Sequence, residues 1–143
     1  MNYGNNSFER AMIVDDNSVD RYTTSYVMRK NSFAGEILEF SMGTEAIRYL
    51  EANQNHPGFF PEIIVLDLRM PAMDGFEFLE RLSRLPQCAK QNCQVIVLSS
   101  SLDPGDRKRV EEYPVVTQFV NKPLHRADLE VISTVYMEAL VGS

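Results

Sequence analysis

One segment carries most of the information about architecture: Glu62-Ile-Ile-Val-Leu-Asp67-Leu-Arg-Met-Pro71-Ala-Met-Asp-Gly75-Phe-Glu-Phe-Leu-Glu-Arg-Leu82. Its apolar run ends in the carboxylate of Asp67, passes Pro71 and an Asp-Gly pair, and gives way to apolar residues at helical spacing. This order predicts a buried strand, a turn and a helix. Ligands of parallel α/β sheets bind at the carboxyl ends of the strands, where loops and helix amino termini converge. Asp67 is therefore the first candidate for chemistry.

Length and composition limit the kinds of protein to consider. The 143 residues are 44% hydrophobic and 24% charged, as expected for one domain with a buried core. The formal net charge of −6 argues against binding to nucleic acid or to an anionic membrane. A cytoplasmic location is expected, because no apolar run could span a bilayer and the first ten residues contain no signal-peptide core. We interpret Cys88 and Cys93 as reduced thiols, since a zinc site would need further ligands.

Apolar runs alternate with segments of helical spacing along the rest of the chain. A flexible tail is predicted for residues 1–9, followed by a single domain over residues 10–143. The strands are predicted at residues 11–14, 37–40, 63–66, 95–98 and 115–120. Such alternation indicates an α/β fold, a doubly wound five-stranded parallel sheet with helices on both faces. The strands are continuously hydrophobic, which fits burial on both sides.

Three of the predicted helices have features that bear on function. The first helix is expected to end at Gly35 and to place one row of side chains on a single face: Val19, Tyr22, Tyr26 and Val27. The fourth helix, at residues 103–112, is weakly amphipathic, so we expect it to be mobile. Its main apolar residue is Val110. The last helix also has an apolar face, formed by Leu129, Ile132, Val135, Tyr136 and Leu140.

Polar residues follow four of the predicted strands at the point where each strand ends. They are Asp15, Asp16, Asp67, Ser99 and Lys122. All belong to the same edge of a parallel sheet, so the carboxylates are expected to lie close together. Two such charges 4 Å apart repel by about 4 kcal/mol at an effective dielectric constant of 20, which favours a bound cation.

The types of side chain at this edge indicate a particular chemistry. A few oxygen ligands together with phosphate oxygens suit magnesium. Lys122 supplies a point charge that can pair with a carboxylate or a phosphoryl group, and Ser99 supplies a hydroxyl donor. The set reads as an aspartate nucleophile, a metal that neutralises a phosphoryl group, and two donors for the remaining oxygens.

With these residues in place, the chain resembles the receiver domains of two-component response regulators, of the chemotaxis-regulator type. The resemblance extends from about Arg10 to Leu140. It implies a flavodoxin-like (βα)5 sheet with strand order 2-1-3-4-5. The matching features are the Asp15-Asp16 pair, the segment from Asp67 to Pro71 with Asp74-Gly75, the serine at position 99, and Lys122-Pro123.

The resemblance also implies a role for each site residue. Asp67 would accept a phosphoryl group from a phosphohistidine on a sensor histidine kinase or a histidine phosphotransfer protein. The cofactor would be Mg²⁺, or Mn²⁺. Asp16 would bind the metal directly and Asp15 largely through water, together with Asp67 and the backbone carbonyl of Arg69. The chain would not be an enzyme beyond assisting its own phosphorylation and dephosphorylation.

Further residues are implied for switching, for the rim of the site and for its turns. Ser99 would move to bind the phosphoryl group beside Lys122, and Phe119 would change rotamer. The face formed by the fourth helix, fifth strand and last helix would then bind a downstream protein. A homodimer is left open as a further partner. The rim residues, Arg69 and Ser101, would tune hydrolysis of the acyl phosphate, and the turn residues are Pro71, Gly75 and Pro123, the last preceded by a cis bond in many relatives.

Three other kinds of protein share parts of this pattern. A phosphatase that forms an aspartyl phosphate needs a general acid two residues after the nucleophile, where this chain has Arg69. A flavin-binding protein needs a phosphate loop after the first strand, but the acidic segment from Asp15 to Asp20 would repel a phosphate. A degenerate receiver that is not phosphorylated and acts as a protein-binding module remains the alternative. No DNA-binding output domain is expected within the 143 residues.

Overall fold

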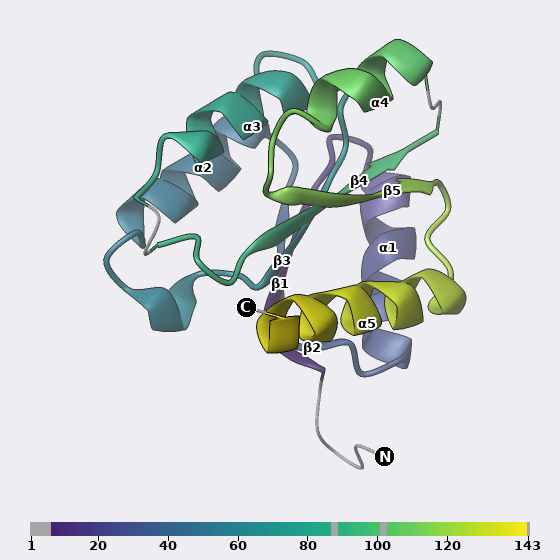
Figure 1. The fold of residues 1–143 in the computed structure, drawn as a ribbon. Helices are drawn as coiled ribbons and strands as arrows, with labels where there is room; N and C mark the ends of the chain where they lie inside the picture. The colour runs from purple at the N-terminus through teal and green to yellow at the C-terminus, as the bar shows by residue number, and fades with distance from the viewer. Residues whose placement is uncertain (1–6, 87–88, 101–102, 143) are drawn as a thin grey trace.

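The computed structural model describes residues 7–86, 89–100 and 103–142, and confirms the predicted fold class. Five parallel strands form one sheet in the order β2-β1-β3-β4-β5, the flavodoxin-like order (Figure 1). The strands are β1 (Phe8–Val14), β2 (Ala34–Phe40), β3 (Ile63–Leu66), β4 (Gln94–Ser99) and β5 (Val116–Asn121). The helices are α1 (Ser18–Lys30), α2 (Gly43–Ala52), the short 3-10 helix η1 (Pro57–Phe59), α3 (Gly75–Ser83), α4 (Pro104–Val110) and α5 (Arg126–Gly142).

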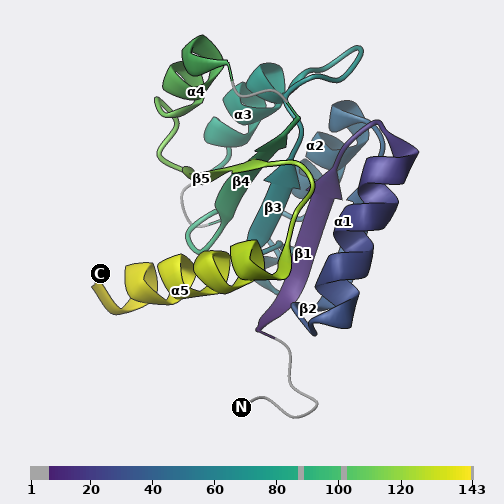
Figure 2. The ribbon, with the colours of Figure 1, turned by 90° about the vertical axis from the view of Figure 1, so that its right-hand side faces the viewer.

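Helices cover both faces of the sheet and enclose two separate cores (Figure 2). Adjacent residues of a strand point to opposite faces, so Ile64 lies in the core under α2 and α3, while Val65 lies in the core under α1 and α5. Every residue of β3 and β4 is buried. Burial on both faces explains why these strands read as continuous apolar runs.

The first strand begins earlier than predicted. The side chain of Phe8 is buried, and its ring meets the rings of Phe33 and Tyr136 edge-on, with centroids 4.9 and 5.0 Å away. Placing residues 8 and 9 in a flexible tail was therefore wrong. The polar residues Glu9 and Arg10 interrupt the apolar pattern and hid the start of this strand. Residues 1–6 of the predicted tail lie outside the described residues.

The end predicted for the first helix was also wrong. Helix α1 ends at Lys30, and the N–H of Asn31 donates to the carbonyls of Arg29 and Val27. Gly35 lies within β2 rather than at the helix end. The side chain of Asn31 also bonds to the carbonyl of Val27, which closes the last turn without a glycine.

The row of apolar residues predicted on α1 exists, but most of it faces solvent. Val19, Tyr22 and Tyr26 are exposed, and the two tyrosine rings stack with centroids 6.2 Å apart. The helix instead buries Thr24, Ser25 and Met28. Hydrophobic spacing alone therefore selected the wrong face of this helix, because its buried face is built largely from small polar side chains.

The remaining boundaries shift by only a few residues. Helix α4 is shorter than the predicted 103–112, and Val110 is its buried residue, as expected. Strand β5 begins and ends one residue later than predicted. On α5 the predicted face is buried at Leu129, Ile132 and Tyr136, whereas Leu140 is 45% exposed.

Candidate functional site

The carboxyl edge of the sheet brings together the polar residues that follow the strands. Asp15 follows β1, Asp67 follows β3, Ser99 ends β4 and Lys122 follows β5. A cavity of about 520 Å³ at this edge is lined by Asp67, Ser99 and Lys122 together with Asp16 and Arg69. Asp15, Asp67 and Ser99 are buried, while Asp16 is exposed.

The three carboxylates form a cluster suited to a small hard cation. One oxygen from each of Asp15, Asp16 and Asp67 lies within 4.8 Å of the others. Oxygen ligands from few carboxylates are what magnesium prefers, because it keeps several of its own waters. The donor set therefore fits Mg²⁺, and it would also accept Mn²⁺, which has the same preference for carboxylate and water.

Lys122 links the acidic residues. Its Nζ lies 2.7 Å from Oδ2 of Asp20, 2.9 Å from Oδ2 of Asp15 and 3.6 Å from Oδ2 of Asp67. Burial alone would lower the pKa of Lys122, but hydrogen bonds to Asp20 and Asp15 and the charge of Asp67 outweigh burial and raise that pKa above its ordinary value. The ammonium group thus stays charged and offsets part of the acidic cluster.

Asp67 is the acidic residue whose ionisation is most strongly perturbed. Burial, followed by the neighbouring charge of Asp15, raises the pKa of Asp67 to about 6, although Lys122 and the backbone N–H of Arg69 oppose this shift. That N–H lies 3.4 Å from Oδ1 of Asp67. A buried carboxylate with a raised pKa, inside a cavity and beside a lysine, is typical of a functional group.

The turn after Asp67 is held by tight backbone geometry. The N–H of Gly75 donates to the carbonyl of Leu68 at 2.9 Å. A Cβ at position 75 would lie 2.7 Å from Cα of Leu68, so only glycine fits there without a shift of the backbone. Asp74 then caps α3 by accepting from the N–H of Glu77. Ala72, in the loop between Leu68 and Asp74, adopts a positive φ of 66°.

The two predicted turn prolines lie beside the site. Pro71 is exposed in the loop between β3 and α3, directly before Ala72. The bond between Lys122 and Pro123 is cis. The roles of these prolines as turn residues of the site stay predictions.

The structure places the predicted switch residues without testing their roles. Ser99 is the buried last residue of β4, next to the cavity. Phe119 is half-buried in β5, and Cζ of Arg107 lies 5.5 Å from its ring centroid. Ser101, predicted at the rim, lies outside the described residues.

Sequence reasoning missed two acidic residues that contact predicted site residues. Asp20 holds Lys122 from the first turn of α1. It lies four residues after Asp16, so helical spacing could have placed it near the cluster. Asp106 on α4 forms an ion pair with Arg69. No local pattern indicates that contact, since it joins residues 37 positions apart in sequence.

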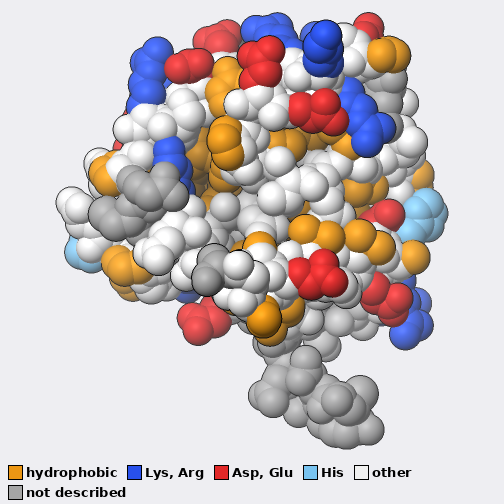
Figure 3. All heavy atoms as spheres, in the orientation of Figure 1, with side chains coloured by type: hydrophobic (Ala, Val, Ile, Leu, Met, Phe, Trp, Pro, Cys, Tyr) orange, Lys and Arg blue, Asp and Glu red, His pale blue; other side chains and the backbone are white. Residues whose placement is uncertain are grey.

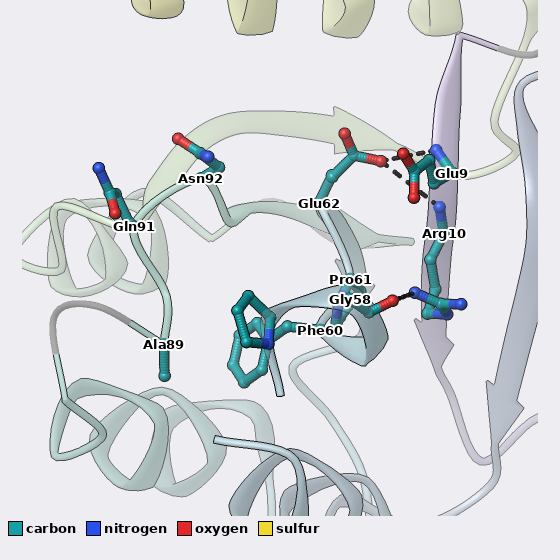
Figure 4. Close-up of a pocket in the computed structure, with 10 residues that line it drawn as sticks. Glu9, Arg10, Gly58, Phe60, Pro61, Glu62, Ala89, Gln91 and Asn92 are labelled. Carbon is teal, nitrogen blue, oxygen red and sulfur yellow. Dashed lines mark hydrogen bonds between the residues drawn. The ribbon is translucent and has the colours of Figure 1, made fainter. Parts of the chain in front are cut away.

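A second cavity, of about 560 Å³, lies at the opposite end of the strands (Figure 4). Two of its charged side chains, those of Arg10 and Glu62, form contacts within the fold. Arg10 donates to the carbonyl of Gly58 and bonds to Glu36, and Glu62 accepts from the N–H of Glu9 at 2.6 Å. We therefore place the candidate site at the carboxyl edge, where the acidic cluster and Lys122 meet.

Comparisons with known proteins concern the chain as a whole. The model of a family described as "Response regulator receiver domain" matches residues 11–133. A two-component response regulator from Cytophaga hutchinsonii has a similar structure, with a TM-score of 0.83 and 28% identity over 91% of this chain and 97% of that one. A response regulator receiver protein from Dyadobacter fermentans gives a TM-score of 0.79 and 27% identity over 90% of this chain and 98% of that one.

Curated relatives differ in how much of their length this chain spans. "Probable methanogenesis regulatory protein FilR2" of Methanothrix harundinacea is 28% identical over 83% of this chain and 75% of the relative. The "Cyclic di-GMP phosphodiesterase response regulator RpfG" of Xanthomonas campestris is 29% identical over 82% of this chain, but only 29% of the relative is matched. In the part of this chain that the structure describes, no helix is long and apolar enough to cross a membrane.

Proposed function

The chain belongs to the family of response regulator receiver domains, and we propose that Asp67 is its phosphoacceptor in a His-Asp phosphorelay. The observation that supports this most directly is the cluster of Asp15, Asp16 and Asp67, whose oxygens lie within 4.8 Å of one another. Lys122 stands 3.6 Å from Asp67, where a cation would pair with added phosphoryl oxygens.

The proposed reaction is a phosphoryl transfer from a phosphohistidine. An oxygen of Asp67 forms a bond to phosphorus as the P–N bond of the donor breaks, and the electron pair of that bond passes to the imidazole nitrogen. The carboxylate must be ionised to act as the nucleophile. Since the pKa of Asp67 is raised to about 6, most of the protein is in the reactive form at neutral pH.

The residues that would hold the metal are Asp15, Asp16, Asp67 and the backbone carbonyl of Arg69. A bound Mg²⁺ or Mn²⁺ supplies positive charge that neutralises the phosphoryl oxygens. Lys122 binds a further oxygen, and its contacts with Asp15 and Asp20 orient the ammonium group toward Asp67. Ser99 donates its hydroxyl to another oxygen. We propose no chemistry of this chain beyond gain and loss of this phosphoryl group.

We propose that the face of α4, β5 and α5 binds the downstream protein. Figure 3 looks onto this face and shows hydrophobic side chains along α5, below a margin of charged side chains at the level of α4. Val131 and Met137 are exposed on α5, and Phe119 is half-buried in β5. The hydroxyl of Ser99 and the ring of Phe119 would connect this face to the site by moving together after phosphorylation.

The partners proposed on the input side are a sensor histidine kinase or a histidine phosphotransfer protein. The net charge of −6 gives no basis for nucleic acid or membrane binding. We also propose that phosphorylated chains can form a homodimer, which size-exclusion chromatography would detect.

Intact mass measured after incubation with acetyl phosphate and Mg²⁺ tests the proposal. The wild type is expected to gain a single phosphoryl group. No group should be gained when the metal is chelated before the donor is added. Asp67→Asn should gain none. Asp74→Asn is the matched control, because asparagine can still cap α3 and the same charge is lost nearby.

Equal labelling of the wild type and Asp67→Asn would overturn the assignment of the phosphoacceptor. No labelling of a folded wild type, even with several phosphodonors, would leave the degenerate receiver as the better description. Size-exclusion chromatography of the labelled protein reports whether a dimer forms.

A further inference from the structure

Helix α4 is attached to the body of the molecule mainly through arginine side chains. Within Pro104–Val110, all of which the structure describes, Val110 is the only buried residue. Three contacts of a different kind join the helix to its surroundings. Asp106 pairs with Arg69, Arg109 lies over the ring of Phe76 with Cζ 3.9 Å from the centroid, and Arg107 lies over the ring of Phe119 at 5.5 Å.

Of these three contacts, only the Arg69–Asp106 pair includes a residue that is close in sequence to Asp67. Arg69 follows Asp67 by two residues, lines the same cavity, and its backbone N–H lies 3.4 Å from Oδ1 of Asp67. Its side chain is 65% exposed, so it is free to move, whereas the side chain of Asp106 is 17% exposed. Arg69 thus contacts Asp67 through its backbone and Asp106 of α4 through its guanidinium.

We propose that Arg69 exchanges Asp106 for the phosphoryl group when Asp67 is phosphorylated, and that this exchange releases α4. The inference rests on the phosphorylation proposed above and adds a residue that carries the signal out of the site. Arg69 acts here as a positioning residue for α4. Its partner in the resting protein is a carboxylate with one charge, while the modified Asp67 presents more charge and three acceptor oxygens.

The balance between the two partners favours the exchange. The pair with Asp106 is weakened on the side of Arg69, because water screens this exposed guanidinium and ordering its long side chain opposes the pair. A guanidinium bound to phosphoryl oxygens can make two parallel charge-assisted hydrogen bonds. Lys122 is committed to Asp15 and Asp20, so it does not by itself satisfy every new oxygen.

Movement of the Arg69 side chain toward the phosphoryl group changes the charges around the start of α3. Cζ of Arg69 lies 5.9 Å from the ring centroid of Phe76, on which Arg109 also stacks. Asp106 is the acidic residue that pairs with one of these two cations. When Arg69 turns to the phosphoryl group, Asp106 loses its partner and α4 keeps Val110 and the contacts of Arg107 and Arg109. The helix is then expected to open more often.

The test combines substitution with phosphorylation and measures the opening of α4 by amide hydrogen exchange. Asp106→Asn removes the charge that holds Arg69, Arg69→Gln removes the guanidinium, and Arg81→Gln is the matched control. Arg81 makes a comparable pair with Glu51, at 2.8 Å, between α3 and α2 and away from α4. Exchange of the amides of 103–112 is measured by mass spectrometry before and after acetyl phosphate with Mg²⁺.

In the wild type, phosphorylation should speed exchange in α4 by about fivefold, the effect of one lost hydrogen bond. Unphosphorylated Asp106→Asn should already show the faster exchange, and phosphorylation should add little to it. Arg81→Gln should respond like the wild type. The lifetime of the phosphoryl group separates the two site variants: Arg69→Gln should shorten it by removing a contact, whereas Asp106→Asn should not shorten it.

Two results would overturn the exchange of partners. One is an effect of Asp106→Asn that simply adds to that of phosphorylation. The other is equal shortening of the phosphoryl lifetime in both site variants, as expected if the pair were only a structural clamp. If the wild type gains no phosphoryl group at all, the failure lies in the proposed phosphorylation.

Discussion

Helices α3 and α4 follow adjacent parallel strands and begin in the same way, yet they are held by different forces. Each starts at an aspartate whose side chain accepts from a backbone N–H, Asp74 from Glu77 and Asp103 from Gly105. Helix α3 then buries five residues, and α4 buries Val110 alone. The same connection between strand and helix has thus produced one fixed helix and one held largely by charge.

The difference indicates which helix can respond to chemistry at Asp67. Burying a Leu or Phe side chain contributes about 1.5–3 kcal/mol, so α3 cannot leave the sheet without exposing several such groups. An exposed ion pair contributes about 0–1 kcal/mol. Added charge at the end of β3 can therefore change the contacts of α4 while leaving α3 in place.

The largest expected effect comes from testing the cores under the two helices. Leu79→Ala in α3 should lower the free energy of unfolding by about 3–5 kcal/mol, because it leaves a cavity under a fully buried side chain. Val110→Ala in α4 should lower it by about 1–3 kcal/mol. Urea unfolding followed by circular dichroism measures both. Equal losses would mean that α4 is as firmly anchored as α3.

The second prediction concerns Asp67, which follows β3 directly and precedes the turn into α3. Its pKa is raised from 3.8 to about 6, so the folded protein holds a proton that the unfolded chain releases between these pH values. Ionised Asp67 therefore destabilises the fold above pH 6, and this loss fades as the pH falls toward 4. In chelator at pH 7.5, Asp67→Asn should raise the free energy of unfolding by about 2–3 kcal/mol.

The control for that measurement is Glu138→Gln, an exposed position on α5. The gain from Asp67→Asn should shrink to well under 1 kcal/mol at pH 4, while the control should show no such trend. A gain that does not depend on pH would mean that the destabilisation does not come from ionisation of Asp67.

A third, smaller effect is expected at the matched helix caps. Asp74→Ala should lower the global free energy of unfolding by about 1 kcal/mol, because α3 unfolds with the rest of the protein. Asp103→Ala removes an equivalent cap, but it should mainly speed hydrogen exchange within α4. If both substitutions lower global stability to the same extent, α4 does not open separately.

The smallest effect is expected in the loop that leads from Asp67 into α3. Ala72 has a φ of 66°, where a Cβ is unfavourable. Ala72→Gly relieves this strain but makes the unfolded chain more flexible, so the net gain should be about 0.5 kcal/mol. Thermal unfolding of the two proteins measures it, and a loss of stability would show that the turn is not strained.

The fold and the positions of the site residues could be predicted because both depend on short-range patterns. Apolar runs ended by Asp67, Ser99 and Lys122 mark the strand ends, and parallel strands then bring those ends together. The exposed face of α1 was not predictable in this way, because the helix buries Thr24 and Ser25 instead of its tyrosines.

The contacts that modify the site could not be predicted from the sequence either. The pair between Arg69 and Asp106 depends on how α4 lies across the molecule, and that placement is set by the whole fold. Phe8 was missed because Glu9 and Arg10 interrupt the apolar pattern, and its partners Phe33 and Tyr136 are distant in the chain. In each case the deciding contact joins residues that no local pattern connects.

The contacts of Lys122 with Asp15 and Asp20 can form only late in synthesis. The acidic residues at positions 15, 16, 20 and 67 are all made before the lysine that offsets them. At roughly 5–20 residues per second, the stretch between Asp67 and Lys122 takes about 3–11 seconds to translate. Throughout that interval these acidic residues lack this cation, and their charge is partly offset only after the residues of the fifth strand have been made.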